Sequence, residues 1–151
     1  MLFRSMQSEF LVIADALAPG IIFAQAIGRF GNWFNGELFG KPSTLPWALE
    51  IPLEKRPITF SSFETFHPTF LYEALWCVVI GFILLQITPK RSGQIFWLYV
   101  SLYSIGRVLI ESIRIDYSNL ILGARLNVWV AAICAAVGVW QYLKSSPKKI
   151  G

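Results

Sequence analysis

Apolar residues in this chain fall into four long runs, which cover approximately residues 10–27, 70–88, 94–114 and 121–142. A helix that crosses the hydrocarbon core of a bilayer needs roughly 20 mostly apolar residues. Each run is therefore long enough to span a membrane. The pattern predicts an all-α fold, a polytopic transmembrane bundle of about four helices.

Polar residues interrupt the first two runs. The first contains Asp15 and Pro19, and we expect the proline to kink its helix or to begin a new helical turn. Asp15 either shapes this helix or has a polar role inside the bundle. The second run carries only Glu73, near its start and next to Tyr72. We expect both of these residues to pack at the membrane interface rather than to take part in chemistry.

One long connection, residues 41–69, separates the first two runs. Its prolines at positions 42, 46, 52, 57 and 68 argue against a continuous helix. The pieces "WALEI" and "ITFSSF" are candidates for two short paired strands at the membrane surface. With no repeats in the sequence, we expect a single membrane domain.

The positively charged residues predict the orientation, since short cytoplasmic loops are rich in lysine and arginine. Lys90 and Arg91 lie in the tight connection between the second and third runs, and three lysines follow the fourth run. Both ends of the chain are then cytoplasmic and the long connection faces outward. Lys41, Lys55 and Arg56 in that connection oppose this assignment.

Composition supports the membrane class. The 151 residues are 55% hydrophobic and 15% charged, with a mean hydropathy of +0.55, which is too apolar for an ordinary soluble domain. The net charge of +4 comes from scattered cations, so polynucleotide binding is not expected. Cys77 and Cys134 lie inside apolar runs and indicate neither a disulfide nor a metal site. No cofactor is indicated.

The third run carries a polar stripe. At 100° per residue, Tyr103, Arg107, Glu111 and Arg114 fall within an arc of about 80° on one helical face. Each buried charge costs on the order of 3 kcal/mol, so such residues face a cavity or one another. Arg107 and Glu111 have the spacing of an ion pair. Either they merely neutralise each other or they belong to a polar site in the outer half of the membrane.

Residues 28–40, "GRFGNWFNGELFG", place polar side chains directly after the first run. Glycines let a backbone approach a ligand closely, and Arg29, Asn32 and Asn35 supply hydrogen-bond donors. Two arginines from distant segments suit a phosphate, because guanidinium binds its oxygens in a bidentate way. The alternative is a glycine-rich interfacial turn, with Arg29 reaching for water and Trp33 in the aromatic belt.

The chain resembles a known family. The stretch "GRFGNWFNGELFGKP" is similar to the signature of the bacterial prolipoprotein diacylglyceryl transferases. The resemblance spans about residues 10–142 and continues through "ADALAPG", "LPWALEI", "HPTFLYEAL" and "YSIGRVLIESIR". The wording "AQAIGRFGNWFN" looks most like actinobacterial versions. The resemblance implies a multi-pass plasma-membrane enzyme that transfers a diacylglyceryl group from phosphatidylglycerol to the lipobox cysteine thiol of a prolipoprotein, releasing glycerol phosphate.

The resemblance also implies roles for particular residues. Arg29 and Arg107 would hold and neutralise the phosphate, Glu111 would orient Arg107, and preorganised charge of this kind stabilises a leaving group. Asn32 would bind the headgroup, and His67 is the candidate base for the thiol. The positions that match functional positions of the family are Arg29, Asn32, Glu37, Gly40, His67, Tyr103, Arg107 and Glu111.

The resemblance suggests that the chain corresponds to the C-terminal portion of such enzymes. Residues 1–9 are atypical, residues 10–142 resemble the membrane domain, and residues 143–151 form a basic tail. The family's N-terminal helices and its histidine-glycine-glycine motif have no counterpart, since His67 is the only histidine. The alternative function is therefore a noncatalytic fragment that retains an anionic-phospholipid site.

Overall fold

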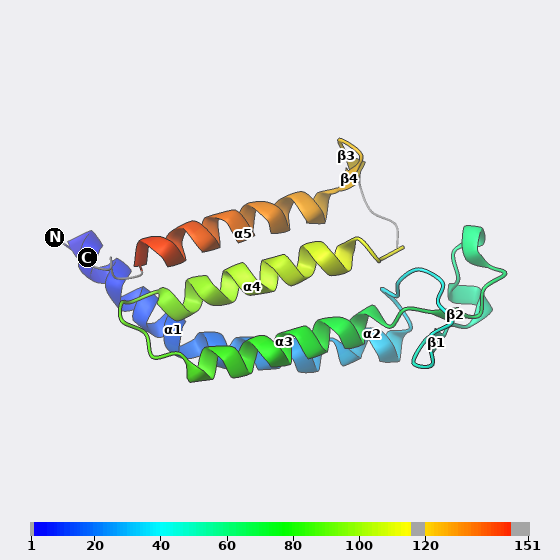
Figure 1. Ribbon diagram of the computed structural model, residues 1–151, viewed down its shortest axis with the longest axis horizontal. Helices are drawn as coiled ribbons and strands as arrows, with labels where there is room; N and C mark the ends of the chain where they lie inside the picture. The colour runs from blue at the N-terminus through cyan, green and yellow to red at the C-terminus, as the bar shows by residue number, and fades with distance from the viewer. Residues whose placement is uncertain (1, 116–119, 146–151) are drawn as a thin grey trace.

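Four long helices and one short helix dominate the computed structural model, which describes residues 2–115 and 120–145. The long helices lie side by side along the longest dimension of the molecule (Figure 1). The start of α1 and the end of α5 lie at the same end (Figure 1), as expected for an even number of crossings. The helices are α1 (Leu2–Gly28), α2 (Phe30–Asn35), α3 (Thr69–Gln86), α4 (Gln94–Glu111) and α5 (Leu126–Ser145).

Three segments are long and apolar enough to cross a membrane: Ser8–Asn35, Thr69–Gln86 and Leu126–Ser145. Helix α4 has the same length as α3, 18 residues, but carries the polar stripe and packs against α1, α3 and α5. The predicted all-α membrane bundle is confirmed. Pro19 lies inside α1 without ending it.

The start of the fourth helix differs from the prediction. Residues expected to begin a helix at 121 instead form the hairpin of β3 (Leu120–Ile121) and β4 (Ala124–Arg125), and α5 begins at Leu126. Leu122 and Gly123 have φ angles of 52° and 80°. These left-handed conformations make a tight turn and are incompatible with a right-handed helix.

Short strands hold the long connection together. In it, β1 (Leu49–Glu50) pairs with β2 (Thr65–Phe66) in antiparallel fashion. The expectation that "WALEI" contributes a strand is confirmed, but its expected partner "ITFSSF" is wrong. Ile58–Phe60 forms a 3₁₀ turn, in which Phe60 N donates to Pro57 O at 2.8 Å. Pro57 favours this turn because the proline ring fixes its φ angle.

The core lies between α1, α3 and α4. Small residues allow the helices to approach closely, as is common in membrane proteins. A Cβ atom on Gly106 of α4 would lie 2.1 Å from Trp76 Nε1 of α3, and Trp76 Nε1 donates to Leu102 O at 2.9 Å. The buried apolar residues of this core are Ala18, Ile22, Ala26, Cys77, Ile80, Leu84 and Ile95.

Candidate active site at the loop end of the bundle

Charged side chains gather where the helices meet the 41–69 connection. We call this the loop end of the bundle, and we call the end that holds the α3–α4 connection the opposite end (Figure 1). At the loop end, Arg29 lies in the turn between α1 and α2, Glu73 in the first turns of α3, and Arg107 in the last turns of α4. The α1–α2 turn, α3 and α4 thus present one charged residue each to a common region.

Glu73 joins the two arginines. Its carboxylate contacts Arg107 Nη1 through Oε1, and its Oε2 lies 2.7 Å from Arg29 Nε. The Arg29 contact is electrostatic, because the N–H does not point at the oxygen and Oε2 accepts no aligned hydrogen bond within residues 2–115 and 120–145. The Glu73 side chain is only 6% exposed, against 23% and 20% for the arginines. The Glu73 carboxylate is therefore buried and holds two partly accessible cations together, an arrangement that we call the clamp.

This role of Glu73 was not predicted from the sequence. The sequence does carry a signal for it, because an unpaired carboxylate inside an apolar run of membrane-spanning length is energetically unfavourable and requires a partner. Spacing along the chain did not reveal the partner, since Arg107 is 34 positions away. The expectation that Glu73 packs at the interface is wrong, because its side chain is buried between two arginines.

Glu111 is a second buried carboxylate, with a side chain only 1% exposed. Its Oε2 accepts a hydrogen bond from Arg107 Nη2 at 3.1 Å and lies 3.5 Å from Arg114 Nη1. Its Oε1 accepts a hydrogen bond from Asn127 Nδ2 at 3.2 Å and lies 2.9 Å from Arg125 Nε. Glu111 therefore ties the start of α5 to α4 as well as contacting Arg107.

The ion pairs named above join four arginines to two glutamates. Charge interactions are stronger in the low-dielectric interior than in water. We call this set, which comprises Arg29, Glu73, Arg107, Glu111, Arg114 and Arg125, the arginine–glutamate network. Its two partly accessible cations, Arg29 and Arg107, make the loop end suitable for an anion.

Tyr103 links the signature segment to α4. Its hydroxyl accepts a hydrogen bond from Arg29 Nη2 at 2.9 Å, and its ring stacks on Tyr99 with centroids 6.0 Å apart. The structure thus brings together Arg29, Tyr103, Arg107 and Glu111, four of the residues singled out in the sequence. Arg29 contacts α3 and α4 at once, so it is more than a side chain at the membrane interface.

The other signature residues lie beside the network. The Asn32 side chain is half-buried and has no hydrogen-bond partner in the part of the chain that the structure describes. Its amide is therefore available to a ligand. Glu37 is exposed and accepts a hydrogen bond from Asn35 Nδ2 at 3.1 Å. Neither residue joins the arginine–glutamate network directly.

Gly40 lies where several backbone segments converge. Its N–H donates to His67 O at 2.9 Å, and it forms a bridge with Arg114, three residues beyond the end of α4. A Cβ atom here would lie 2.8 Å from His67 Cβ and 3.0 Å from Ile113 Cγ2. Glycine is required by this packing, which ties the signature segment to α3 and α4.

His67 belongs to a separate polar cluster in the connection. Its Nδ1 lies 2.9 Å from the Tyr72 hydroxyl, which also accepts a hydrogen bond from Trp47 Nε1 at 3.1 Å. Within residues 2–115 and 120–145, no hydrogen bond or ion pair connects the His67 side chain directly to the arginine–glutamate network. Tyr72 orients the imidazole, since a bond at one ring nitrogen determines the proton at the other.

A cavity of about 210 Å³ opens between α4 and α5 beside Arg107. Tyr103, Ser104, Arg107 and Asn127 line its polar side, while Val130, Ala131 and Cys134 form an apolar wall. This combination of a cation and an apolar wall suits an amphiphile with an anionic headgroup.

Comparison with known proteins identifies the family. Residues 1–144 match the family model described as prolipoprotein diacylglyceryl transferase. The chain belongs to this family. The resemblance stated from the signature segment is thereby confirmed.

Several curated relatives are actinobacterial proteins named phosphatidylglycerol–prolipoprotein diacylglyceryl transferase. The protein from Frankia alni is 50% identical over 133 residues, which is 86% of this chain and 35% of the relative. A second from Streptomyces coelicolor is 50% identical over 80% of this chain and 39% of the relative. That from Paenarthrobacter aurescens is 45% identical over 89% of this chain and 47% of the relative. The chain thus spans about a third to a half of these relatives' length.

Proposed function

We propose that this chain takes part in transferring the diacylglyceryl group of phosphatidylglycerol to the lipobox cysteine of a prolipoprotein. The observation that carries the proposal is the pair Arg29 and Arg107, which reach a common region from the α1–α2 turn and from α4 and share Glu73. Two guanidinium groups with partly accessible side chains suit a lipid phosphate. The relatives' printed names support this transferase over a noncatalytic lipid-binding fragment.

In the proposed reaction, the cysteine sulfur attacks the glyceryl carbon that carries the phosphate ester oxygen. A C–S bond forms, the C–O bond breaks, and glycerol phosphate leaves with the electron pair of that bond. Arg29 and Arg107 stabilise the charge that develops on the leaving group, because preorganised donors act strongly in a site that excludes water. Asn32 supplies a further hydrogen-bond donor to the headgroup.

The thiol proton requires an acceptor, and His67 is the proposed base. In that role its Nδ1 carries a proton and donates to the Tyr72 hydroxyl, 2.9 Å away, while Nε2 takes the thiol proton. A free cysteine thiol has a pKa of about 8.5, so a base of this kind raises the thiolate fraction. Glu37 and Gly40 are proposed to shape the headgroup side of the same region.

We further propose that the protein lies in the bacterial plasma membrane, with the loop end toward the outer leaflet. Ser62 in the 41–69 connection and Ser92 in the α3–α4 connection are both exposed. In a Cys77→Ser, Cys134→Ser background, Ser62→Cys should react with an impermeant thiol reagent in intact cells, and Ser92→Cys only after lysis. The reverse pattern would place the loop end at the cytoplasmic face.

Transfer itself is tested with the purified chain in vesicles of phosphatidylglycerol that carries a labelled diacylglyceryl group. Label should enter a lipobox peptide, and a peptide with serine in place of the cysteine is the control. His67→Ala should lower transfer about a hundredfold if the histidine is the base. Absence of transfer by the correctly inserted chain would contradict the proposed activity.

A further inference from the structure

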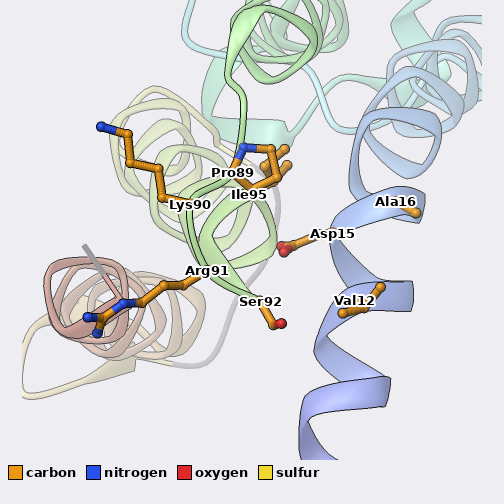
Figure 2. Close-up of a pocket in the computed structure, with 8 residues that line it drawn as sticks. All are labelled: Val12, Asp15, Ala16, Pro89, Lys90, Arg91, Ser92 and Ile95. Atoms are coloured by element: carbon orange, nitrogen blue, oxygen red, sulfur yellow. The ribbon is translucent and has the colours of Figure 1, made fainter. Parts of the chain in front are cut away.

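Asp15 is a buried carboxylate at the opposite end of the bundle from the arginine–glutamate network. It belongs to α1 and is 8% exposed. Its Oδ2 accepts a hydrogen bond from Gly93 N at 2.7 Å, and its Oδ1 accepts one from Phe96 N at 2.8 Å. Figure 2 shows the carboxylate pointing from α1 toward the start of α4. Both oxygens are thus engaged by the backbone of another helix.

These hydrogen bonds cap α4. The first N–H groups of a helix lack intrahelical partners, and a carboxylate is favourable there. The residue before α4 is Gly93, with φ of 89° and no side chain to serve as a cap. The Gln94 side chain instead accepts a hydrogen bond from Lys90 N at 2.8 Å. Asp15 therefore supplies, from α1, the cap that the local sequence of α4 does not.

The surroundings of Asp15 show that backbone groups, rather than cations, compensate its charge. A cavity of about 470 Å³ lies beside it, and Lys90 and Arg91 are among the lining residues. Their side chains nevertheless project away from α1 (Figure 2). No ion pair to Asp15 occurs in the described residues 2–115 and 120–145. The contact is thus specific to the position of the α4 backbone.

Arg29 directly follows α1, and its N–H still donates to Gln25 O at 3.1 Å. At helical spacing it lies about four turns from Asp15 and within about 40° of the same face. The residues buried between them are small or aliphatic, and such contacts determine little about the relative height of two helices. Polar contacts between the α1 side and α4 include those of Asp15, the hydrogen bond from Tyr99 to Gln25 Oε1 at 3.2 Å, and that from Arg29 to Tyr103. The face therefore has a polar contact at each end.

Pro19 makes the contact at Asp15 more important. A proline inside a helix removes the hydrogen bond to the carbonyl four residues earlier, and here that carbonyl belongs to Asp15. Helices bend most readily at such positions. The segment before the proline is held to α4 by Asp15, and the segment after it ends at Arg29.

We propose that Asp15 is a positioning residue: by capping α4 it sets the height of α1 against α4 and so directs Arg29 toward Glu73 and Tyr103. The expected effect of Asp15 on diacylglyceryl transfer rests on the proposed function, whereas its effect on the register of α1 against α4 does not. Register is therefore measured directly, by cross-linking in membranes.

The test pair is Gln25→Cys with Tyr99→Cys, in a Cys77→Ser, Cys134→Ser background and with a short bifunctional thiol reagent. Asp15→Asn loses one acceptor oxygen, and we expect a several-fold loss of cross-linking between α1 and α4. Asp15→Leu, which loses both oxygens, should show a larger loss.

Two controls distinguish a change in the register of α1 against α4 from a general loss of folding. Ser104→Cys with the native Cys134, both of which line the α4–α5 cavity, should cross-link equally in all Asp15 variants. Glu9→Gln changes an exposed carboxylate of the same helix and should leave the α1–α4 yield unchanged. Helical content by circular dichroism should stay constant throughout.

Equal α1–α4 yields in wild type, Asp15→Asn and Asp15→Leu would overturn the proposal. Loss of both cross-links together with helical content would also overturn it, because it would assign Asp15 to folding alone. Where the wild-type chain transfers diacylglyceryl, Asp15→Asn should lower the rate by about tenfold or more, since small misplacements of a positioning group are costly. A wild-type chain that transfers nothing counts against the proposed function and leaves the cross-linking result intact.

Discussion

The two ends of the bundle compensate buried charge in different ways. At the loop end, Glu73 and Glu111 contact arginine side chains from other turns and other helices. At the opposite end, Asp15 accepts hydrogen bonds from two backbone N–H groups at the start of α4, those of Gly93 and Phe96. The carboxylates are similarly buried, so burial alone does not distinguish the ends.

The difference lies in what the partner groups can do. Arginine side chains rotate and have five donors each, so a guanidinium can keep a carboxylate contact and still bind an anion. Backbone N–H groups in a helix have one direction and no such freedom. The loop end is therefore suited to binding, and the opposite end to holding two helices in place. Figure 1 shows that the bundle separates the two ends by its full length.

The largest effect is expected from removing the clamp at the loop end. Glu73→Ala leaves Arg29 and Arg107 without their shared carboxylate, and breaking a buried pair in this way costs about 4 kcal/mol of unfolding free energy. Unfolding in detergent micelles measures this loss. Glu64→Gln, a change at an exposed carboxylate of the connection, is the control. Equal unfolding free energies of the two variants would show that the contacts of Glu73 with the two arginines do not stabilise the fold.

Arg107→Lys tests whether the network binds a ligand or only balances charge. Lysine keeps the charge but loses the bidentate geometry, so transfer should fall about a hundredfold without loss of membrane insertion. The labelled-diacylglyceryl assay measures the change. The matched control is Arg91→Lys, at an exposed position of the opposite end. Near-normal transfer would mean that Arg107 serves only as a structural partner of the glutamates.

Gly40→Ala tests the packing beside the network. The added Cβ atom would lie 2.8 Å from His67 Cβ, and overpacking of this kind costs about 2 kcal/mol. Thermal unfolding of the detergent-solubilised protein measures it. Gly31→Ala is the control, since a Cβ atom there meets nothing within 4 Å. Unchanged stability with weaker lipid binding would instead assign Gly40 to direct contact with the headgroup.

The smallest effect is expected from Tyr72→Phe, which removes the hydroxyl between His67 and Trp47. Loss of these partly exposed hydrogen bonds should cost about 1 kcal/mol. If His67 is the base, transfer should fall more than stability suggests, because the imidazole is no longer oriented. Trp47→Phe, which removes one of the two contacts, should have the weaker effect on transfer. Equal effects of both variants would argue against orientation of His67 by Tyr72.

The periodicity of the sequence was sufficient to predict features that depend on a single helix. The spacing of Tyr103, Arg107 and Glu111 predicted one polar face of α4, and the structure places all three in the site. It was insufficient for Glu73, whose partners come from the α1–α2 turn and from α4. It also misplaced the start of α5, because the turn at Leu122 and Gly123 interrupts an apolar run without changing its hydropathy.

By itself, the sequence determined the membrane class, the helical bundle, the polar face of α4 and the family, because hydropathy, helical period and a signature segment are all local properties. Only the tertiary structure decided that Glu73 clamps two arginines, that Asp15 caps another helix, and that Gly40 lies among three backbone segments. The physical reason is that the free-energy cost of burying an unpaired charge implies that the charge has a partner, but it does not specify which residue that partner is. That choice is made by how the helices pack.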